Sequence, residues 1–220
     1  MSSSQVSPAG GSVPAGGSAR SAPTASDAAG SSDDFKSIFT WRGANKTRLE
    51  QARVQVTGDR IKVYGQIIGA ATDEHEAFSA TYDLLTNDAG ITRRLAVHLI
   101  RASGETQISI TRDGENTWLV QTPQGMERGD FDGAEDVDLA LSPLFNALPI
   151  RRHNLHREPG EVEVPVVYLY LPEATVTAAT VHYTATADAI TVVSPVSNGA
   201  TITVDSTGFV QDYSGLADRV

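Results

Sequence analysis

The chain has 220 residues, of which 40% are hydrophobic and 20% charged, a composition typical of a soluble globular protein. Its net charge is −10, and in a chain without a basic stripe this charge disfavours nucleic-acid partners and docking on anionic membranes. The absence of cysteine excludes disulfides and thiolate metal sites, and no apolar stretch approaches the roughly 20 residues of a membrane-spanning helix.

The first 34 residues are rich in Ser, Ala, Gly and Pro and contain no aromatic residue. They have neither the basic and apolar regions of a secretory signal nor the Arg-rich, amphipathic pattern of a transit peptide. Because nothing in them can offset the entropy of ordering the backbone, we expect a disordered leader at Met1–Asp34 and one folded domain at Phe35–Val220. The expected location is the cytoplasm.

From Phe35 onward the main pattern is alternation of apolar and polar residues, which is typical of β-strands. In the first half, turns containing Gly separate expected strands at 53–56, 61–68, 78–84, 95–101, 106–112 and 117–120. In the second half, strands are expected at 161–171, 175–186, 189–194 and 200–205. About nine to eleven strands at this spacing predict a single all-β domain built on antiparallel sheet.

Two segments depart from simple alternation. Residues 138–147 are the one stretch compatible with a short helix, which Pro143 limits. The expected strand is apolar on both faces from Val164 to Leu171. Such a strand is either sandwiched between two layers or turned toward an apolar ligand.

Motifs for known chemistry are absent from the sequence: it has no nucleophile elbow, phosphate-binding loop or dinucleotide fingerprint. His153 and His156 lie three residues apart and precede Glu158, but zinc sites need three or four ligands. A solvated loop is the favoured interpretation of this stretch, and we expect no metal and no cofactor.

Asp136 and Asp138 bracket an apolar residue, so their carboxylates lie on one face of a strand at the start of a buried segment. A structural network with Arg151 and Arg152 is favoured, while a role as general acid and base is the alternative. Arg93, at the head of an expected strand, is either a rim residue or the cation that receives a polar ligand head.

One long motif resembles a known family. The residues Gly133-x-x-Asp136-Val137-Asp138-Leu139, then Ser142-Pro143, then Asn146-x-Leu148-Pro149-Ile150-Arg151-Arg152 resemble the hallmark of the bacterial family called "putative glycolipid-binding". Weaker similarity extends from Thr40 to Arg219. The chain departs from the family pattern at Ala134, where the family has Cys, and at Phe145 and His153.

The resemblance implies a curved, spiral β-roll, a half-barrel like those of lipid and lipoprotein carriers, whose concave apolar face would suit an acyl chain. It also implies a non-enzymatic carrier or sensor of a glycolipid or lipid-like amphiphile. On this hypothesis the ligand-binding residues are Arg93, Asp136, Asp138, Asn146, Arg151, Arg152 and Tyr82.

Two alternatives stay open at this point. The chain could be an enzyme acting on a small amphiphile through Asp136 or Asp138, or an interaction module with Met1–Asp34 as its tether. The sequence does not name the ligand, its head group or the oligomeric state.

Overall fold

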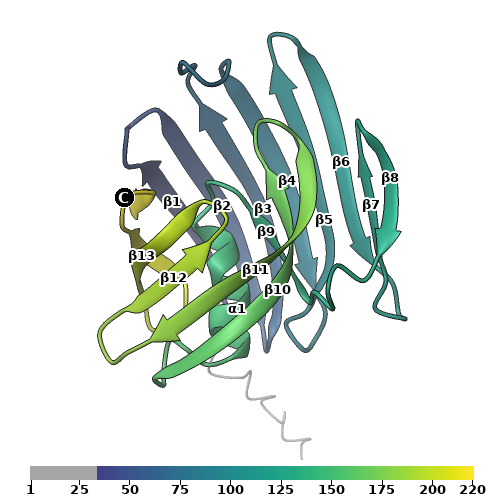
Figure 1. Ribbon diagram of the computed structural model, residues 1–220. Helices are drawn as coiled ribbons and strands as arrows, with labels where there is room; N and C mark the ends of the chain where they lie inside the picture. Colours follow the sequence, from purple (N-terminus) through teal and green to yellow (C-terminus); the bar gives the residue numbers. More distant parts are fainter. Residues whose placement is uncertain (1–33) are drawn as a thin grey trace, which may run out of the picture.

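A computed structural model describes residues 34–220, and the predicted leader, apart from Asp34, lies outside the described residues. The first half of this part is a run of antiparallel hairpins (Figure 1). Its strands are β1 (Phe35–Gly43), β2 (Arg48–Thr57), β3 (Arg60–Gly69), β4 (Phe78–Thr86), β5 (Thr92–Arg101), β6 (Gly104–Arg112), β7 (Trp118–Thr122) and β8 (Gly125–Gly129).

The second half begins with a short strand and a helical segment and then returns to hairpins. The helical segment consists of a 3-10 turn, η1 (Leu144–Asn146), and one helix, α1 (Ala147–Arg152). The strands are β9 (Asp136–Leu139), β10 (Gly160–Tyr170), β11 (Thr175–Ala185), β12 (Ile190–Ser194), β13 (Ser197–Val204), β14 (Val210–Tyr213) and β15 (Ala217–Arg219).

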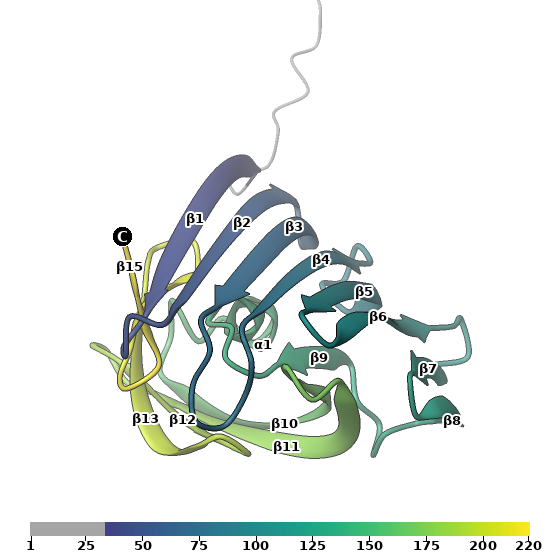
Figure 2. The ribbon, with the colours of Figure 1, turned by 90° about the horizontal axis from the view of Figure 1, so that it is seen from above.

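All fifteen strands of the described chain belong to one sheet, in the order β8-β7-β6-β5-β4-β3-β2-β1-β15-β14-β13-β12-β11-β10-β9. Each pair is antiparallel except β9 and β10, which are parallel. The sheet curls so that β1–β6 form one layer and β10–β13 the opposite layer, with β9 and α1 between them (Figure 2). Its two edge strands, β8 and β9, do not pair, so the roll stays open. The prediction of an all-β, curved sheet is confirmed.

The expected helix at 138–147 is wrong in its position. Residues 136–139 form β9, and the helix begins only at Ala147. Pro143 directly precedes η1, and Pro149 lies in the first turn of α1, where a backbone N–H has no partner within the helix. The strand count is also higher than expected, because β1, β8, β9, β14 and β15 were not predicted, and all of these except β1 have five residues or fewer.

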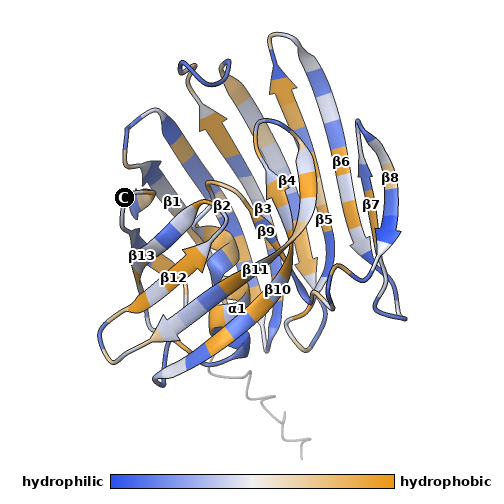
Figure 3. Ribbon diagram, in the orientation of Figure 1, coloured by the Kyte–Doolittle hydropathy of each residue, from blue (hydrophilic) through white to orange (hydrophobic). Residues whose placement is uncertain are grey.

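Alternation decides which side chains enter the roll (Figure 3). In β3, for example, every second residue is buried from Ile61 to Gly69. The inner face of β1–β7 packs against β9, η1 and β10 in one apolar cluster. The largest members of this cluster, all less than 2% exposed, are Trp41, Trp118, Tyr82, Phe145, Phe209, Ile67, Leu84, Leu95 and Leu99.

The expected open, apolar concave face is therefore wrong for this protein. The segment from Asp136 to Arg152, here called the plug, occupies the hollow of the roll. Phe145 contacts Tyr82 at 5.5 Å between ring centroids, so the side chains of the chain itself fill the space.

The strand that is apolar on both faces is a sandwiched one. Val167 and Leu169 of β10 join the cluster beneath β1–β7, whereas Val166 and Tyr168 face a second cluster with β11–β14. Of the two alternatives from the sequence, packing between layers is the one observed.

Within residues 34–220, no helix has both the length and the apolar character needed to cross a bilayer.

Candidate functional site

The acidic pair of the plug, Asp136 and Asp138, is only partly available to a ligand. Asp136 is fully buried and receives two hydrogen bonds from Arg152, Nη1 to Oδ1 at 2.6 Å and Nη2 to Oδ2 at 2.7 Å. Burial raises the pKa of Asp136, and the Arg152 guanidinium opposes that shift. The predicted structural pairing of Asp136 with an arginine is confirmed, and the fork leaves neither carboxylate oxygen without a partner.

Asp138 lies on the same face of β9 and has no ion pair with the described residues. Burial raises its pKa to about 7, and the nearby Asp136 charge adds to the shift. It borders a crevice between the plug and β10–β14 whose volume is about 10 Å³. A volume of that size holds about one water molecule. A role for Asp138 in catalysis stays a prediction.

The other predicted ligand residues are spread over the roll. Asn146 donates to the Pro143 carbonyl and accepts from the Tyr183 hydroxyl at 3.1 Å. Arg151 donates to the Thr207 carbonyl, and its guanidinium lies 5.7 Å from the Phe209 ring.

Arg93, on β5, donates to the Asp113 carbonyl at 3.0 Å, and the backbone N–H of its neighbour Thr92 donates to the carbonyl of Glu135, next to Asp136, at 3.0 Å. The structure thus brings Asp136, Asp138, Asn146 and Arg152 together in the plug, while the Arg93 side chain bonds the Asp113 carbonyl and none of these four. Binding roles for these residues stay predictions.

Tyr82 points into the roll, where it joins a buried carboxyl that the sequence analysis did not select. The hydroxyls of Tyr82 and Ser142 both donate to Glu50 Oε1, each at 2.6 Å. Glu50 Oε2 is buried with no hydrogen-bond partner among the described residues. Burial raises the pKa of Glu50 to about 7, against the hydrogen bonds and the Arg48 charge. This contact ties the plug to the inner face of β2 and β4.

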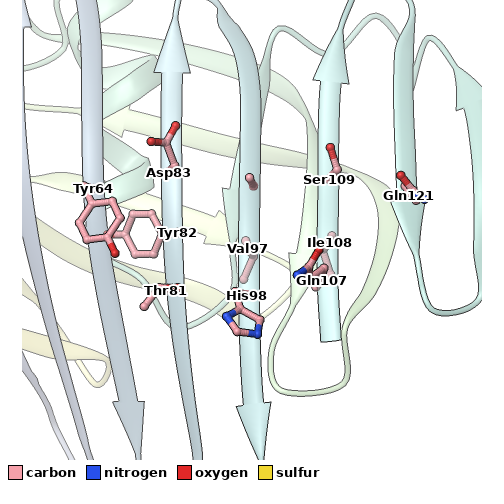
Figure 4. Close-up of a pocket in the computed structure, with 11 residues that line it drawn as sticks. Tyr64, Thr81, Tyr82, Asp83, Val97, His98, Gln107, Ile108, Ser109 and Gln121 are labelled. Carbon is pink, nitrogen blue, oxygen red and sulfur yellow. The ribbon is translucent and has the colours of Figure 1, made fainter. Parts of the chain in front are cut away.

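A hollow lies on the outward face of β3–β7 (Figure 4). Its volume is about 350 Å³, within the range of small-molecule sites. We call it the outer trough. Outward side chains from five neighbouring strands line it: Tyr64, Thr81, Asp83, Ala96, His98, Gln107, Ser109 and Gln121.

The strand register explains why a hollow forms there. Tyr64, Asp83, Ala96, Ser109 and Gln121 are direct partners across β3–β7 and make one row. Ala96 and Ser109, in the middle of the row, are short, whereas Tyr64 and Gln121 at its ends are long. Small residues between large ones leave a depression in an otherwise flat face.

The trough offers an aromatic face and several hydrogen-bonding groups at once. Tyr64 is 59% exposed although it is a large apolar ring. Asp83 Oδ1 accepts from Arg94 at 2.6 Å, and His98 Nε2 lies 3.0 Å from Glu105 Oε2. The side-chain amides of Gln107 and Gln121 make no hydrogen bond with the described residues, so each can donate to and accept from a ligand.

A second hollow, of about 400 Å³, lies at one end of the roll. Arg48 is at its inner side and donates to the Leu216 carbonyl at 3.1 Å. Apolar side chains and acidic residues of the connecting turns line this hollow together. The lining includes His75, Phe78, Leu141, Leu171, Asp73, Glu74 and Glu173. Leu141 of the plug lines this hollow and precedes Ser142, the partner of Glu50.

The sequence contained a partial signal for the buried Glu50 and for the residues of the outer trough. Glu50 is in phase with the buried Ala52 and Val54, so alternation places its carboxyl inside. Alternation likewise places Tyr64 and His98 outside. It does not say that they share one hollow, because that depends on the register between strands.

The fold and its clusters define an open all-β roll with a filled interior. The chain belongs to the family described as "Putative glycolipid-binding", whose sequence profile matches residues 38–219. The crystal structure of a DUF1089-family protein from Pseudomonas aeruginosa is similar in fold, with a TM-score of 0.63 and 23% sequence identity. The similarity covers 78% of this chain and 92% of that one. No curated protein matches the chain.

Proposed function

We propose that this protein binds a glycolipid or a similar amphiphile without transforming it, and that the outer trough receives the sugar head. The single observation that carries the proposal is the exposed Tyr64 ring beside free amides in a hollow of about 350 Å³. A sugar ring has hydroxyls that donate and accept hydrogen bonds and a C–H face that packs on an aromatic ring. The trough is complementary to both features.

The apolar part of the ligand has a place on the same face. Leu49 and Ile68 are direct partners across β2 and β3, and Ile100 continues their row on β5 beyond Ser79. These three side chains are 43%, 52% and 42% exposed. Their row lies two residues along the strands from the row of Thr81, His98 and Gln107 in the trough. An amphiphile can therefore contact apolar and polar rows side by side.

The test is binding to phosphatidylcholine vesicles that contain galactosylceramide, for the wild type and for Tyr64→Ala and Tyr64→Phe. Loss of ring stacking, about 0.5–1.5 kcal/mol, corresponds to roughly two- to tenfold weaker binding for Tyr64→Ala. Tyr64→Phe keeps the ring and should bind nearly as the wild type does. Both variants should keep the wild-type melting temperature, because the side chain is exposed.

Met126→Ala is the matched control, because Met126 is exposed on β8 and does not line the trough. Equal binding of Tyr64→Ala and wild type would contradict the trough as the sugar site. Equal binding of the wild type to vesicles with and without galactosylceramide would contradict an uncharged sugar head as sufficient for binding.

A further inference from the structure

The outward face of the first strands carries an excess of cations, although the whole chain has a net charge of −10. The expectation of a chain without a basic stripe is wrong for this face. The cations are separated by alternation and come from different hairpins, so they form no run in the sequence. Outward cations of β1–β5 are Lys36, Arg42, Arg53, Arg60, Lys62 and Arg94, against one outward acid, Asp83.

Half of these cations are already paired. Arg42 bonds Asp218 at 2.7 Å, Arg60 bonds Asp88 at 2.8 Å, and Arg94 bonds Asp83 at 2.6 Å. For Lys36, Arg53 and Lys62, no carboxylate of residues 34–220 lies within ion-pair distance. Two of the three lysines in the whole chain are in this unpaired set.

The unpaired cations are neighbours in the sheet. Lys36 and Lys62 flank Gln55 as its direct partners on β1 and β3. Arg53 lies two residues before Gln55 on the same face of β2, diagonal to both lysines. Side chains of this length are within reach of one another across such a diagonal. Three positive groups around one amide can therefore meet a single anionic group.

This set adjoins the outer trough. Arg53 is the direct partner of Tyr64, the wall of the trough on β3. A group bound by Lys36, Arg53 and Lys62 would thus be a substituent of a sugar packed on Tyr64. An uncharged ligand would leave the three cations with no counter-charge in the complex.

We propose that the ligand is an anionic glycolipid, whose sugar head carries a sulfate or phosphate that Lys36, Arg53 and Lys62 bind. The inference rests on the proposed function and names the ligand class of the same site. The proposal commits to a lipid-linked sugar, because the apolar row of Leu49, Ile68 and Ile100 lies on the same face. Recognition combines sugar stacking on Tyr64 with charge neutralisation beside it.

The experiment compares phosphatidylcholine vesicles containing sulfatide with vesicles containing galactosylceramide, which differs by lacking the sulfate. We expect tighter binding to sulfatide, with a preference that declines as salt is added, because exposed charges are screened. Lys62→Gln and Arg53→Gln should each reduce the preference by roughly two- to fivefold, the size of an exposed ion pair. Lys46→Gln is the matched control, since it makes the same charge change in the β1–β2 turn.

The outcomes separate the two proposals. Equal binding to both glycolipids overturns the anionic ligand and leaves the proposed function standing. Binding to neither overturns the proposed function as well. Equal binding to phosphatidylserine vesicles, which carry charge without sugar, overturns the sugar-linked anion, and so does a loss with Lys46→Gln as large as that with Lys62→Gln.

Discussion

At the scale of single residues, the buried acids are the groups whose charge controls stability. Asp136 has its counter-charge in the Arg152 fork, whereas Glu50 accepts hydrogen bonds only from hydroxyls, and the Arg48 charge offsets its burial only in part. A buried carboxyl group without a paired cation favours its protonated form. The hydrogen bonds from Tyr82 and Ser142 favour the ionised form of Glu50, but the cost of burying that charge exceeds them, so the folded protein is more stable with Glu50 protonated.

The pH dependence of folding follows from this difference. The pKa of Glu50 rises from 4.5 to about 7 on folding, so the folded state holds a proton that the unfolded chain has released. Stability should then fall as the pH rises from about 4.5 to about 7, by about 3 kcal/mol for this group when the change is complete. Asp138 contributes in the same direction, since its pKa also rises to about 7.

Glu50→Gln keeps an acceptor for Tyr82 and Ser142 and cannot ionise. Urea unfolding at a series of pH values should show a shallower decline of the free energy of unfolding for this variant between pH 5 and 8. Glu127→Gln, at an exposed position on β8, serves as the control and should follow the wild type. An unchanged decline in Glu50→Gln would show that Glu50 is ionised throughout this range.

At the scale of elements, the plug is what distinguishes this roll from an empty half-barrel. Its strand β9 is the inner edge of the sheet, and η1 carries Phe145 against Tyr82. Phe145 is 1% exposed, so its ring contributes packing and does not form part of a ligand pocket.

Phe145→Ala should therefore be costly. Removing a fully buried aromatic ring lowers the free energy of unfolding by about 3–5 kcal/mol, as a transfer loss plus an unfilled cavity. Denaturant unfolding measures this, with exposed Met126→Ala expected to stay within about 0.5 kcal/mol of the wild type. A loss below about 1 kcal/mol for Phe145→Ala would mean that the interior does not close around the ring.

The strands of the first half were predictable because each has a buried face and a solvated face, as in β3 and β4. The plug was predictable only in part: its acidic pair was placed on a strand, but a helix was expected from residue 138, because four residues buried on both faces show no alternation. The arginine partner of Asp136 could be predicted because the motif itself contains it. The outer trough could not, because Tyr64, His98 and Gln121 meet only through register.

At the scale of the whole molecule, the two faces of one sheet have separate tasks. The inner face packs against the plug and supports the fold. The outer face of β1–β7 carries an apolar row, the outer trough and three unpaired cations in adjacent rows, while the remaining surface accounts for the acidic net charge. An amphiphile is therefore expected to lie across the roll and not within it.

Isoleucine methyl groups report on the two faces separately, because Ile68 and Ile100 point outward whereas Ile67 and Ile110 are fully buried. The most direct measurement is a methyl NMR titration with octyl β-galactoside below its micelle concentration. We expect the Ile68 and Ile100 signals to move and those of Ile67 and Ile110 to stay in place. Movement of Ile67 and Ile110, with contacts from the octyl chain to Phe145, would show that the ligand enters the roll and would contradict the account.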